Sequence, residues 1–160
     1  MAAEEYPITT GVRFLREHSV PFIPRLYAYE LHGGTSTASR ELKMEEHAII
    51  KTLVMETDPR NQFLILMHGD KEVSTKQLAR AMGVKSVNPA SEQTAQRVTG
   101  YQVGGISPFG TKQKLPVYVE GTIVQLPKIL INGGKRGFLV EIDPREITRV
   151  FAVTEVNVAI

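Results

Sequence analysis

The chain has 160 residues, of which 42% are hydrophobic and 22% charged, and this is ordinary for one globular domain that buries a core of its own. Its formal net charge of +2 is far from that of a chromatin-type protein, so composition neither implies nor excludes a nucleic-acid partner. The absence of cysteine excludes disulfides, thiolate metal sites and a cysteine nucleophile.

The sequence indicates a cytoplasmic protein that uses neither a metal nor another cofactor. Residues 1–7 lack the basic start and apolar core of a signal peptide, and no apolar run approaches the roughly 20 residues that span a bilayer. The histidines are scattered without paired ligand spacing, which argues against a zinc centre: His18, His32, His47 and His68.

The first third of the chain is predicted to form two helices around an extended segment. Thr10 can cap a helix over residues 11–18, and a polar helix is expected over residues 36–47. Between them, residues 22–29 follow Pro21 and contain Pro24, which suits a strand at the edge of a sheet.

The middle of the chain contains the most apolar stretch. Residues 48–56 are apolar on both faces and predict a central strand, and residues 62–68 are its expected hairpin partner. Further elements are then expected: a helix from the capping box 74–77 to Met82, a short strand 84–87, and a helix 89–98 capped by Asn88.

The last third predicts strands, a helix and a final extended segment, in this order: strands 117–120, 128–131 and 138–142, a hairpin turn at 132–135, a helix from the capping box 143–146 to Phe151, and a strand or tail 153–158. This mixed, hairpin-rich order favours an α+β fold. We expect a single domain over residues 1–160, with a mixed, curled and barrel-like sheet flanked by helices.

Lys51 is unusual because it lies in the apolar strand 48–56, on the face shared with Ile49, Leu53 and Met55. One interpretation is an edge position from which the long side chain reaches water. The other is a cation at the floor of a pocket, because desolvating an unpaired ammonium is costly.

A glycine-rich loop spans residues 99–110, where no helical or strand period is sustained. Such a loop serves either as a tight connection or as backbone that approaches a ligand closely. It contains no dinucleotide or P-loop motif, and Ser107 lacks the second glycine of a nucleophile elbow. Basic residues flank the loop and the later turn, as a phosphate-bearing ligand would require: Lys112, Lys114, Lys128, Lys135 and Arg136.

Several stretches together resemble the YbaK/EbsC family, the prolyl-tRNA synthetase-associated editing domains that deacylate mischarged tRNA. The resemblance covers nearly the whole chain, and its matching stretches are 51–53, 83–87, 95–101, 103–108, 115–116 and 133–137. The run Thr-Gly-Tyr-x-Val-Gly-Gly-Ile-Ser-Pro with a later Gly-Gly-Lys-Arg-Gly is the most specific part.

The resemblance implies hydrolysis of the ester between an amino acid and the terminal ribose of tRNA. Lys51 matches the family's essential lysine, Gly104 a glycine whose backbone lines the scissile ester, and Tyr29 an aromatic residue at the pocket mouth. The other expected substrate-binding residues are Tyr101, Gly105, Ile106, Ser107, Asn132, Gly133, Gly134 and Leu139. The residues expected to bind tRNA phosphates are Lys112, Lys114, Lys135 and Arg136. In the cysteine-specific members the thiol of the substrate is thought to attack its own carbonyl.

Two positions depart from the family pattern. Asn132 stands where the cysteine-specific members have a serine just before Gly-Gly. Leu139 stands where those members have a serine or aspartate after Lys-Arg-Gly-x. We predict a trans-acting deacylase for substrates such as Cys-tRNA(Pro), with the aminoacylated 3′ end of tRNA and prolyl-tRNA synthetase as partners and with no membrane partner. A non-catalytic module that binds aminoacyl-tRNA or a nucleotide is the first alternative. Helix-turn-helix DNA binding through residues 74–84 is the second, although Pro89 would disrupt its recognition helix.

Overall fold

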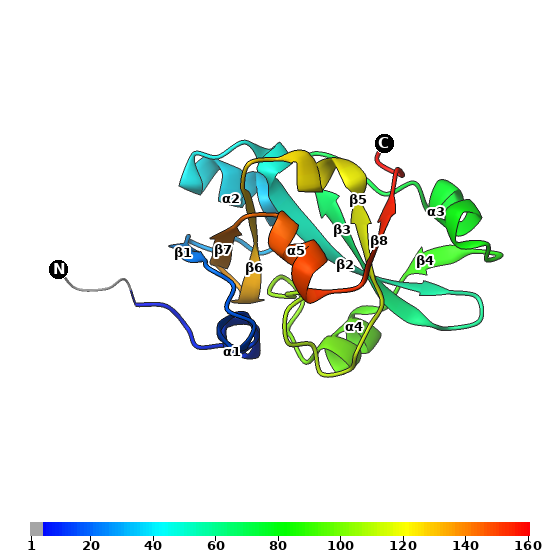
Figure 1. Cartoon of the computed structure of the whole chain (residues 1–160), viewed down its shortest axis with the longest axis horizontal. Coiled ribbons are helices and arrows are strands. Elements are labelled where there is room, and N and C mark those ends of the chain that lie inside the picture. Colours follow the sequence, from blue (N-terminus) through cyan, green and yellow to red (C-terminus); the bar gives the residue numbers. More distant parts are fainter. Residues whose placement is uncertain (1–4) are drawn as a thin grey trace.

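The computed structural model describes residues 5–160, which form an α+β fold around one mixed sheet (Figure 1). The strands are β1 (Ile23–Leu26), β2 (Ile49–Thr57), β3 (Gln62–His68), β4 (Val87–Pro89), β5 (Val117–Glu120), β6 (Ile129–Lys135), β7 (Phe138–Ile142) and β8 (Val153–Val156). The α-helices are α1 (Thr10–Glu17), α2 (Gly34–Leu42), α3 (Thr75–Met82), α4 (Glu92–Thr99) and α5 (Arg145–Val150), and the 3₁₀-helices are η1 (Glu46–Ala48) and η2 (Gly121–Gln125).

The sheet has the strand order β1-β7-β6-β2-β3-β5-β8, and β4 pairs with β2 outside this path. The pairs β1/β7, β6/β7, β2/β3 and β2/β4 are antiparallel, whereas β2/β6, β3/β5 and β5/β8 are parallel. The expectation of a mixed α+β fold with a central strand at residues 48–56 is therefore confirmed, and the proline-containing β1 lies at an end of the order.

The two faces of the sheet are covered differently. Helices α1, α4 and α5 pack on one face over the largest core cluster, to which β2 contributes Ile50 and Val54. The other face carries two separate clusters, one under α3 that includes Met55 and one under α2 that includes Ile49. Lys51 therefore lies on the strip of β2 between these two clusters, and this position leads its side chain into the site described below.

Serine and threonine side chains begin three of the helices. Thr9, Ser74 and Ser91 accept hydrogen bonds from the N–H groups of Val12, Gln77 and Thr94 at 3.0, 3.2 and 3.1 Å. The caps predicted at Thr10 and Asn88 are thus wrong. Pro89 does not open a helix because residues 87–89 pair with β2, so the chain turns into α4 only after this pairing.

Two further expectations differ from the structure. The predicted helix over residues 36–47 ends at Leu42, because Lys43 adopts a left-handed conformation with φ of 54°, and η1 follows separately. No recognition helix follows α3 at residues 84–89, which instead lead into β4, so the helix-turn-helix alternative loses its structural support. Among residues 5–160, no helix is both long and apolar enough to cross a bilayer.

Residues 158–160 add a short pairing beside the turn that follows β3. The backbones of Glu72 and Ile160 exchange two hydrogen bonds of 3.0 and 2.9 Å, and the N–H of Ser74 donates to the carbonyl of Val158 at 2.8 Å. The N–H of Val158 donates to the buried carboxylate of Glu120 at 2.7 Å. The segment is thereby fixed both to the turn and to the end of β5.

Candidate active site

A gap in the sheet lies beside the middle of β2. On this edge β6 pairs only with Ile49 and Ile50, and β4 pairs only with residues 55–57. Residues 51–54 consequently have a partner strand, β3, on one side only. A pocket of about 780 Å³ opens at this gap, within the size range of small-molecule sites.

The pocket reaches both faces of β2 and takes its lining from distant parts of the chain. The lining includes eight of the residues on which the following argument depends: Tyr29, Lys51, Thr52, Gly104, Ile106, Asn132, Arg136 and Leu139. Lys51 and Gly104, the two residues predicted to be catalytic, therefore line the same hollow.

Lys51 is held by the turn that follows β3. Its side chain is 19% exposed, and its Nζ donates to the carbonyl of Lys71 at 2.5 Å and lies 3.5 Å from Oε1 of the largely exposed Glu72. Because an ammonium has three N–H groups, these two acceptors leave one donor for a ligand. The ammonium therefore lies in the wall of a pocket, as the second interpretation expected, and it is paired there with Glu72.

Gly104 lies opposite two side chains that form one wall of the pocket. Its φ is 92°, and a Cβ at this position would lie 2.5 Å from Oη of Tyr29 and 3.1 Å from Nε of Arg136. The Arg136 guanidinium stacks over the Tyr29 ring at 5.1 Å and donates from Nε to the Val103 carbonyl at 2.9 Å. This contact holds the glycine backbone against the wall, where only a residue without a side chain fits.

The Gly105 amide is not available to a ligand. Its N–H donates to the Gln102 carbonyl at 2.8 Å, and a Cβ on Gly105 would lie 2.7 Å from the backbone nitrogen of Arg136. Gly105 therefore packs the loop against the turn after β6. Of the two adjacent glycines, Gly104 is therefore the one whose N–H is a candidate oxyanion donor in the pocket.

Four other predicted substrate-binding residues lie outside the pocket lining and hold the loop. The buried Tyr101 hydroxyl donates to the Phe109 carbonyl and accepts from Thr10 Oγ1 at 2.9 Å, and burial raises its pKa, which keeps it a neutral donor. The buried Ser107 Oγ accepts from the Phe109 N–H at 3.1 Å. Gly133 and Gly134 pack against the rings of Phe138 and Tyr101 respectively. Their contact with substrate stays a prediction.

Asn132 and Leu139 shape the wall formed by β6 and β7. The Asn132 Oδ1 accepts from the N–H groups of Gly134 and Lys135 at 2.6 and 3.1 Å, at an irregularity in the β6/β7 pairing. Its Nδ2 donates to the Gly104 carbonyl at 3.4 Å. Leu139 is buried with Ala38 and Ile49 and makes this part of the wall apolar.

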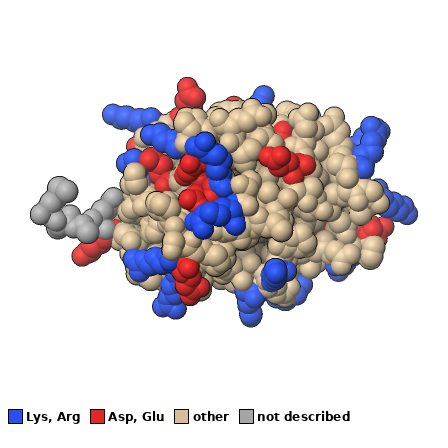
Figure 2. All heavy atoms as spheres, viewed as in Figure 1, with Lys and Arg blue, Asp and Glu red and all other residues tan. Residues whose placement is uncertain are grey.

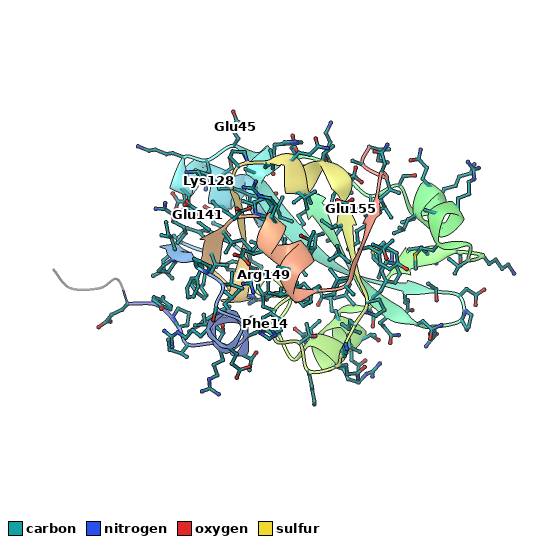
Figure 3. All side chains as sticks on the ribbon, in the orientation of Figure 1. Phe14, Glu45, Lys128, Glu141, Arg149 and Glu155 are labelled. Atoms are coloured by element: carbon teal, nitrogen blue, oxygen red, sulfur yellow. The ribbon has the colours of Figure 1, made fainter. Side chains whose placement is uncertain are left out.

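The basic residues separate into different environments. Lys112, Lys114 and Lys135 are exposed, whereas Arg136 is half-buried in the Tyr29 wall. Lys128 lies 4.0 Å from Glu141, beside which it is seen in Figure 3, and it does not line the pocket. On the face shown in Figure 2, basic and acidic side chains are interspersed rather than gathered by sign.

Two histidines that are 21 positions apart in the sequence stack in the fold. The rings of His47 and His68 lie 3.7 Å apart with an interplanar angle of 6°, and His47 Nδ1 is 2.9 Å from the Asp70 carboxylate. These three residues are the candidate metal ligands among the described residues. A zinc ion about 2.1 Å from a nitrogen of each ring would lie well outside both ring planes, whereas the lone pair of an imidazole nitrogen lies in its ring plane. The stacked arrangement therefore does not fit a metal.

The His68 hydrogen bonds define its protonation. Its Nδ1 lies 2.7 Å from the His47 carbonyl, which can only accept, so Nδ1 carries the proton. Nε2 then accepts from the Thr122 hydroxyl at 2.7 Å in the neutral ring. Burial is the main cause that lowers the pKa of His68.

Thr52 is the pocket residue that sequence reasoning did not single out. Its neighbour Lys51 drew attention through its charge, whereas a threonine in a strand is common. The signal in the structure is different: Thr52 Oγ1 is buried without a hydrogen-bond partner in the part of the chain that is described.

The family model described as "Aminoacyl-tRNA editing domain" matches residues 33–150. A protein of Enterococcus faecalis, named as a candidate Cys-tRNA(Pro)/Cys-tRNA(Cys) deacylase, EbsC, is 31% identical over 140 residues, which are 87% of this chain and 85% of that protein. A proline–tRNA ligase of Brachyspira hyodysenteriae is 30% identical over 86 residues, 54% of this chain but 15% of the ligase.

Two solved structures share the fold at low sequence identity. A protein described as hypothetical has a TM-score of 0.87 at 20% identity, with 95% of this chain and 100% of that chain covered. A candidate trans-editing enzyme for prolyl-tRNA synthetase has a TM-score of 0.81 at 19% identity, with 96% and 98% covered. Together with the family match over residues 33–150, these findings confirm the expected resemblance: the chain belongs to the aminoacyl-tRNA editing domain family.

Proposed function

We propose that this protein hydrolyses, in trans, the ester that joins a mischarged amino acid to the terminal ribose of tRNA. The observation that carries the proposal is that Lys51 and the Gly104 backbone line one pocket in a member of the editing family. Substrates such as Cys-tRNA(Pro) are the first candidates, because the E. faecalis relative is named for them. We place the reaction in the cytoplasm with prolyl-tRNA synthetase as a partner.

The pocket supplies positive charge and a backbone donor to an acyl ester. The free N–H of the Lys51 ammonium would hold an ester oxygen or the terminal nucleotide by a charge-assisted hydrogen bond. The N–H of Gly104 would stabilise the oxyanion that forms when water, or a thiol on the substrate, attacks the carbonyl carbon. One such donor is worth about 3 kcal/mol in other enzymes. The carbon–oxygen ester bond then breaks and the ribose oxygen takes up a proton.

Exposed lysines outside the pocket would bind the tRNA backbone. Lys112, Lys114 and Lys135 are solvent-accessible and lie on the two segments that meet at the glycine loop. Such contacts position a nucleic acid without reading its sequence. Arg136 is engaged with Tyr29 and Val103, so we assign it to the pocket wall in preference to the phosphates.

The test is release of amino acid from Cys-, Ala- and Ser-charged tRNA(Pro), with and without the protein. We expect Lys51→Ala to lower deacylation at least 100-fold and to leave the circular dichroism spectrum unchanged. Lys71→Ala is the matched control, because its backbone carbonyl, which holds Lys51, is kept while a neighbouring charge is removed. Full activity of Lys51→Ala would refute the mechanism.

A non-catalytic module is the second candidate. The apolar Leu139 in the pocket wall favours it, because this side chain offers no hydrogen bond to an aminoacyl group. Binding of aminoacyl-tRNA without release of amino acid from any of the three substrates would establish this alternative.

A further inference from the structure

The gap beside β2 turns the backbone N–H and C=O of Thr52 toward the pocket. Ile49 and Thr57 bond across to Gly69 and Asn61, at 2.7 and 3.0 Å, so odd-numbered residues of β2 direct their N–H and C=O groups toward β3. The carbonyl of Val54 accepts from Ala90 on the other edge at 3.0 Å, as the alternation requires for even-numbered residues.

Thr52 is the even-numbered residue inside the gap. Its N–H and C=O point to the edge where β6 has already ended its pairing at Ile50 and β4 begins only at Met55. These two groups therefore face the pocket without a partner strand. They lie one residue's spacing apart, in the pattern with which a strand receives one residue of an antiparallel neighbour.

The Thr52 hydroxyl adds a third polar atom without a partner. Among residues 5–160, Oγ1 of Thr52 is the buried side-chain nitrogen or oxygen that makes no hydrogen bond. Buried polar groups in folded proteins are almost always satisfied, so an unsatisfied one in a pocket indicates a ligand group. Because Thr52 lines the same pocket as Gly104 and Asn132, such a group would belong to the substrate of that pocket.

We propose that the aminoacyl group of the substrate binds in the gap as a one-residue strand paired with Thr52. This inference rests on the proposed function. The α-ammonium donates to the Thr52 carbonyl and hydroxyl, and the acyl carbonyl accepts from the Thr52 N–H. Recognition is then directed at the main-chain atoms that every α-amino acid carries, which leaves the Lys51 ammonium and the Gly104 N–H for the charge that develops during hydrolysis.

The pairing has a consequence for substrate choice. An aminoacyl group whose amino group is acylated has no positive charge there, and it would place a bulky group against the Thr52 carbonyl. The pocket should therefore distinguish aminoacyl-tRNA from N-acylated tRNA, whichever side chain the amino acid has.

Two probes that differ only by the amino group test the binding. These are 3′-amino-3′-deoxyadenosine acylated on its 3′ nitrogen with an alanyl group and the same compound acylated with a propionyl group, and neither has an ester to hydrolyse. By calorimetry we expect the alanyl probe to bind at least 10-fold more tightly. Thr52→Val should weaken this preference, because it removes the hydroxyl acceptor and keeps the backbone carbonyl, and Thr52→Ser should keep the preference.

A turnover measurement accompanies the binding. Wild-type protein should release alanine from Ala-tRNA(Pro) at least 30-fold faster than it releases N-acetylalanine from the blocked substrate. Thr52→Val should lower this ratio by slowing the release of alanine from the substrate with the free amino group. Thr57→Val is the matched control: this threonine is buried on the same strand, but it bonds to the Pro59 carbonyl at 2.6 Å outside the pocket. It should retain the wild-type ratio even where it lowers stability.

The outcomes separate this inference from the proposed function. Equal binding of the two probes, or an unchanged preference in Thr52→Val, overturns the pairing even if Ala-tRNA(Pro) is hydrolysed. A Thr52-dependent preference for the alanyl probe without hydrolysis of any charged tRNA supports the pairing and refutes the deacylase. Failure of both probes to bind, without any hydrolysis, overturns both.

Discussion

Lys51 and Gly104 reach the pocket for different physical reasons. Lys51 lies where the apolar clusters under α2 and α3 leave a strip of β2 uncovered, and a backbone carbonyl fixes its ammonium. Gly104 is present because the Tyr29 hydroxyl and the Arg136 guanidinium occupy the space that a side chain would need. One residue contributes a charge, and the other contributes unobstructed backbone.

Gly104→Ala should lower both the rate of deacylation and the free energy of unfolding. A Cβ at this position would displace Tyr29 or Arg136, and the φ of 92° disfavours any L side chain. We expect loss of about 1–2 kcal/mol in the free energy of unfolding, measured in urea, together with at least a 10-fold loss of deacylation.

Gly83→Ala is the control for this backbone effect. Gly83 also has a positive φ, 69°, but a Cβ there would meet nothing within 4 Å. It ends α3 outside the pocket lining, so its substitution should cost similar stability without loss of activity. Equal losses of activity in the two variants would show that Gly104 acts only through folding.

At this scale the sequence predicted the residues whose chemistry is unusual for their surroundings. A lysine in an apolar strand and a dense run of glycines are visible without a fold. Thr52 could not be predicted, because its importance depends on where β6 and β4 stop pairing. The loss of Gly105 as a donor likewise depends on one loop hydrogen bond to Gln102.

At the scale of single elements, the end of β6 depends on one side chain. Asn132 Oδ1 accepts from two backbone N–H groups where the β6/β7 register shifts, and this arrangement positions Lys135 and Arg136. The Asn132 amide also reaches the Gly104 carbonyl, so the strand end and the glycine loop are connected.

Substitution of Asn132 separates these two contributions. Asn132→Asp keeps the accepting oxygen and should change the free energy of unfolding by less than about 0.5 kcal/mol, whereas Asn132→Ala leaves both N–H groups unpaired and should cost about 1–3 kcal/mol. Urea denaturation measures both values. Equal stability of the two variants would show that the side chain does not support this strand end.

The boundaries of elements were predicted less well than their existence. A helix starting at Pro89 satisfied every local rule, yet residues 87–89 pair with β2 and the capping role passes to Ser91. Similarly, the polar helix expected to continue to His47 stops at Leu42. In both places pairing or backbone geometry, set by distant residues, decides where the helix lies.

At the scale of the whole molecule, the stacked histidines connect stability to pH. Burial lowers the pKa of His68 below its ordinary value of 6.5, with the neighbouring His47 as a smaller cause in the same direction. The His47 carbonyl, Asp70 and Glu120 act in the opposite direction. Below pH 6.5 the unfolded chain therefore binds a proton at this position more readily than the folded chain.

Stability should consequently fall as the pH is lowered from 7 to 5.5. One such group changes the free energy of unfolding by at most about 1.4 kcal/mol per pH unit. His68→Asn should weaken this dependence, measured by urea denaturation at both pH values. His32→Asn is the control, because His32 is exposed and asparagine suits its φ of 61°. A wild-type dependence in His68→Asn would contradict the assignment.

The binding of tRNA phosphates should appear in the salt dependence of the reaction. Replacing Lys112 and Lys114 together by alanine should lower kcat/KM at low salt, and should reduce the slope against the logarithm of salt concentration by about 0.7–0.9 for each phosphate that the variant no longer neutralises. The double variant Lys76→Ala/Arg80→Ala, on the exposed side of α3, is the control. An equal effect of both double variants would mean that tRNA does not approach along the glycine loop.

The fold class followed from the order of elements, whereas the strand order did not. Strands β2 and β3 form the predicted hairpin, but the parallel pairings of β2 with β6 and of β3 with β5 join segments that are far apart in sequence. These pairings leave the gap that becomes the pocket, so the site is a consequence of topology that local patterns do not contain.

The pairing of Ile160 with Glu72 connects the C-terminal residues to Lys51 in the pocket. The Glu72 side chain lies beside the Lys51 ammonium, and the Glu72 backbone pairs with Ile160. The adjacent carbonyl of Lys71 accepts a hydrogen bond from the same ammonium. A tag, a proteolytic cut or a neighbouring domain that displaces residues 158–160 would therefore disturb the turn that positions the Lys51 ammonium. Attachments intended to be silent are better placed elsewhere.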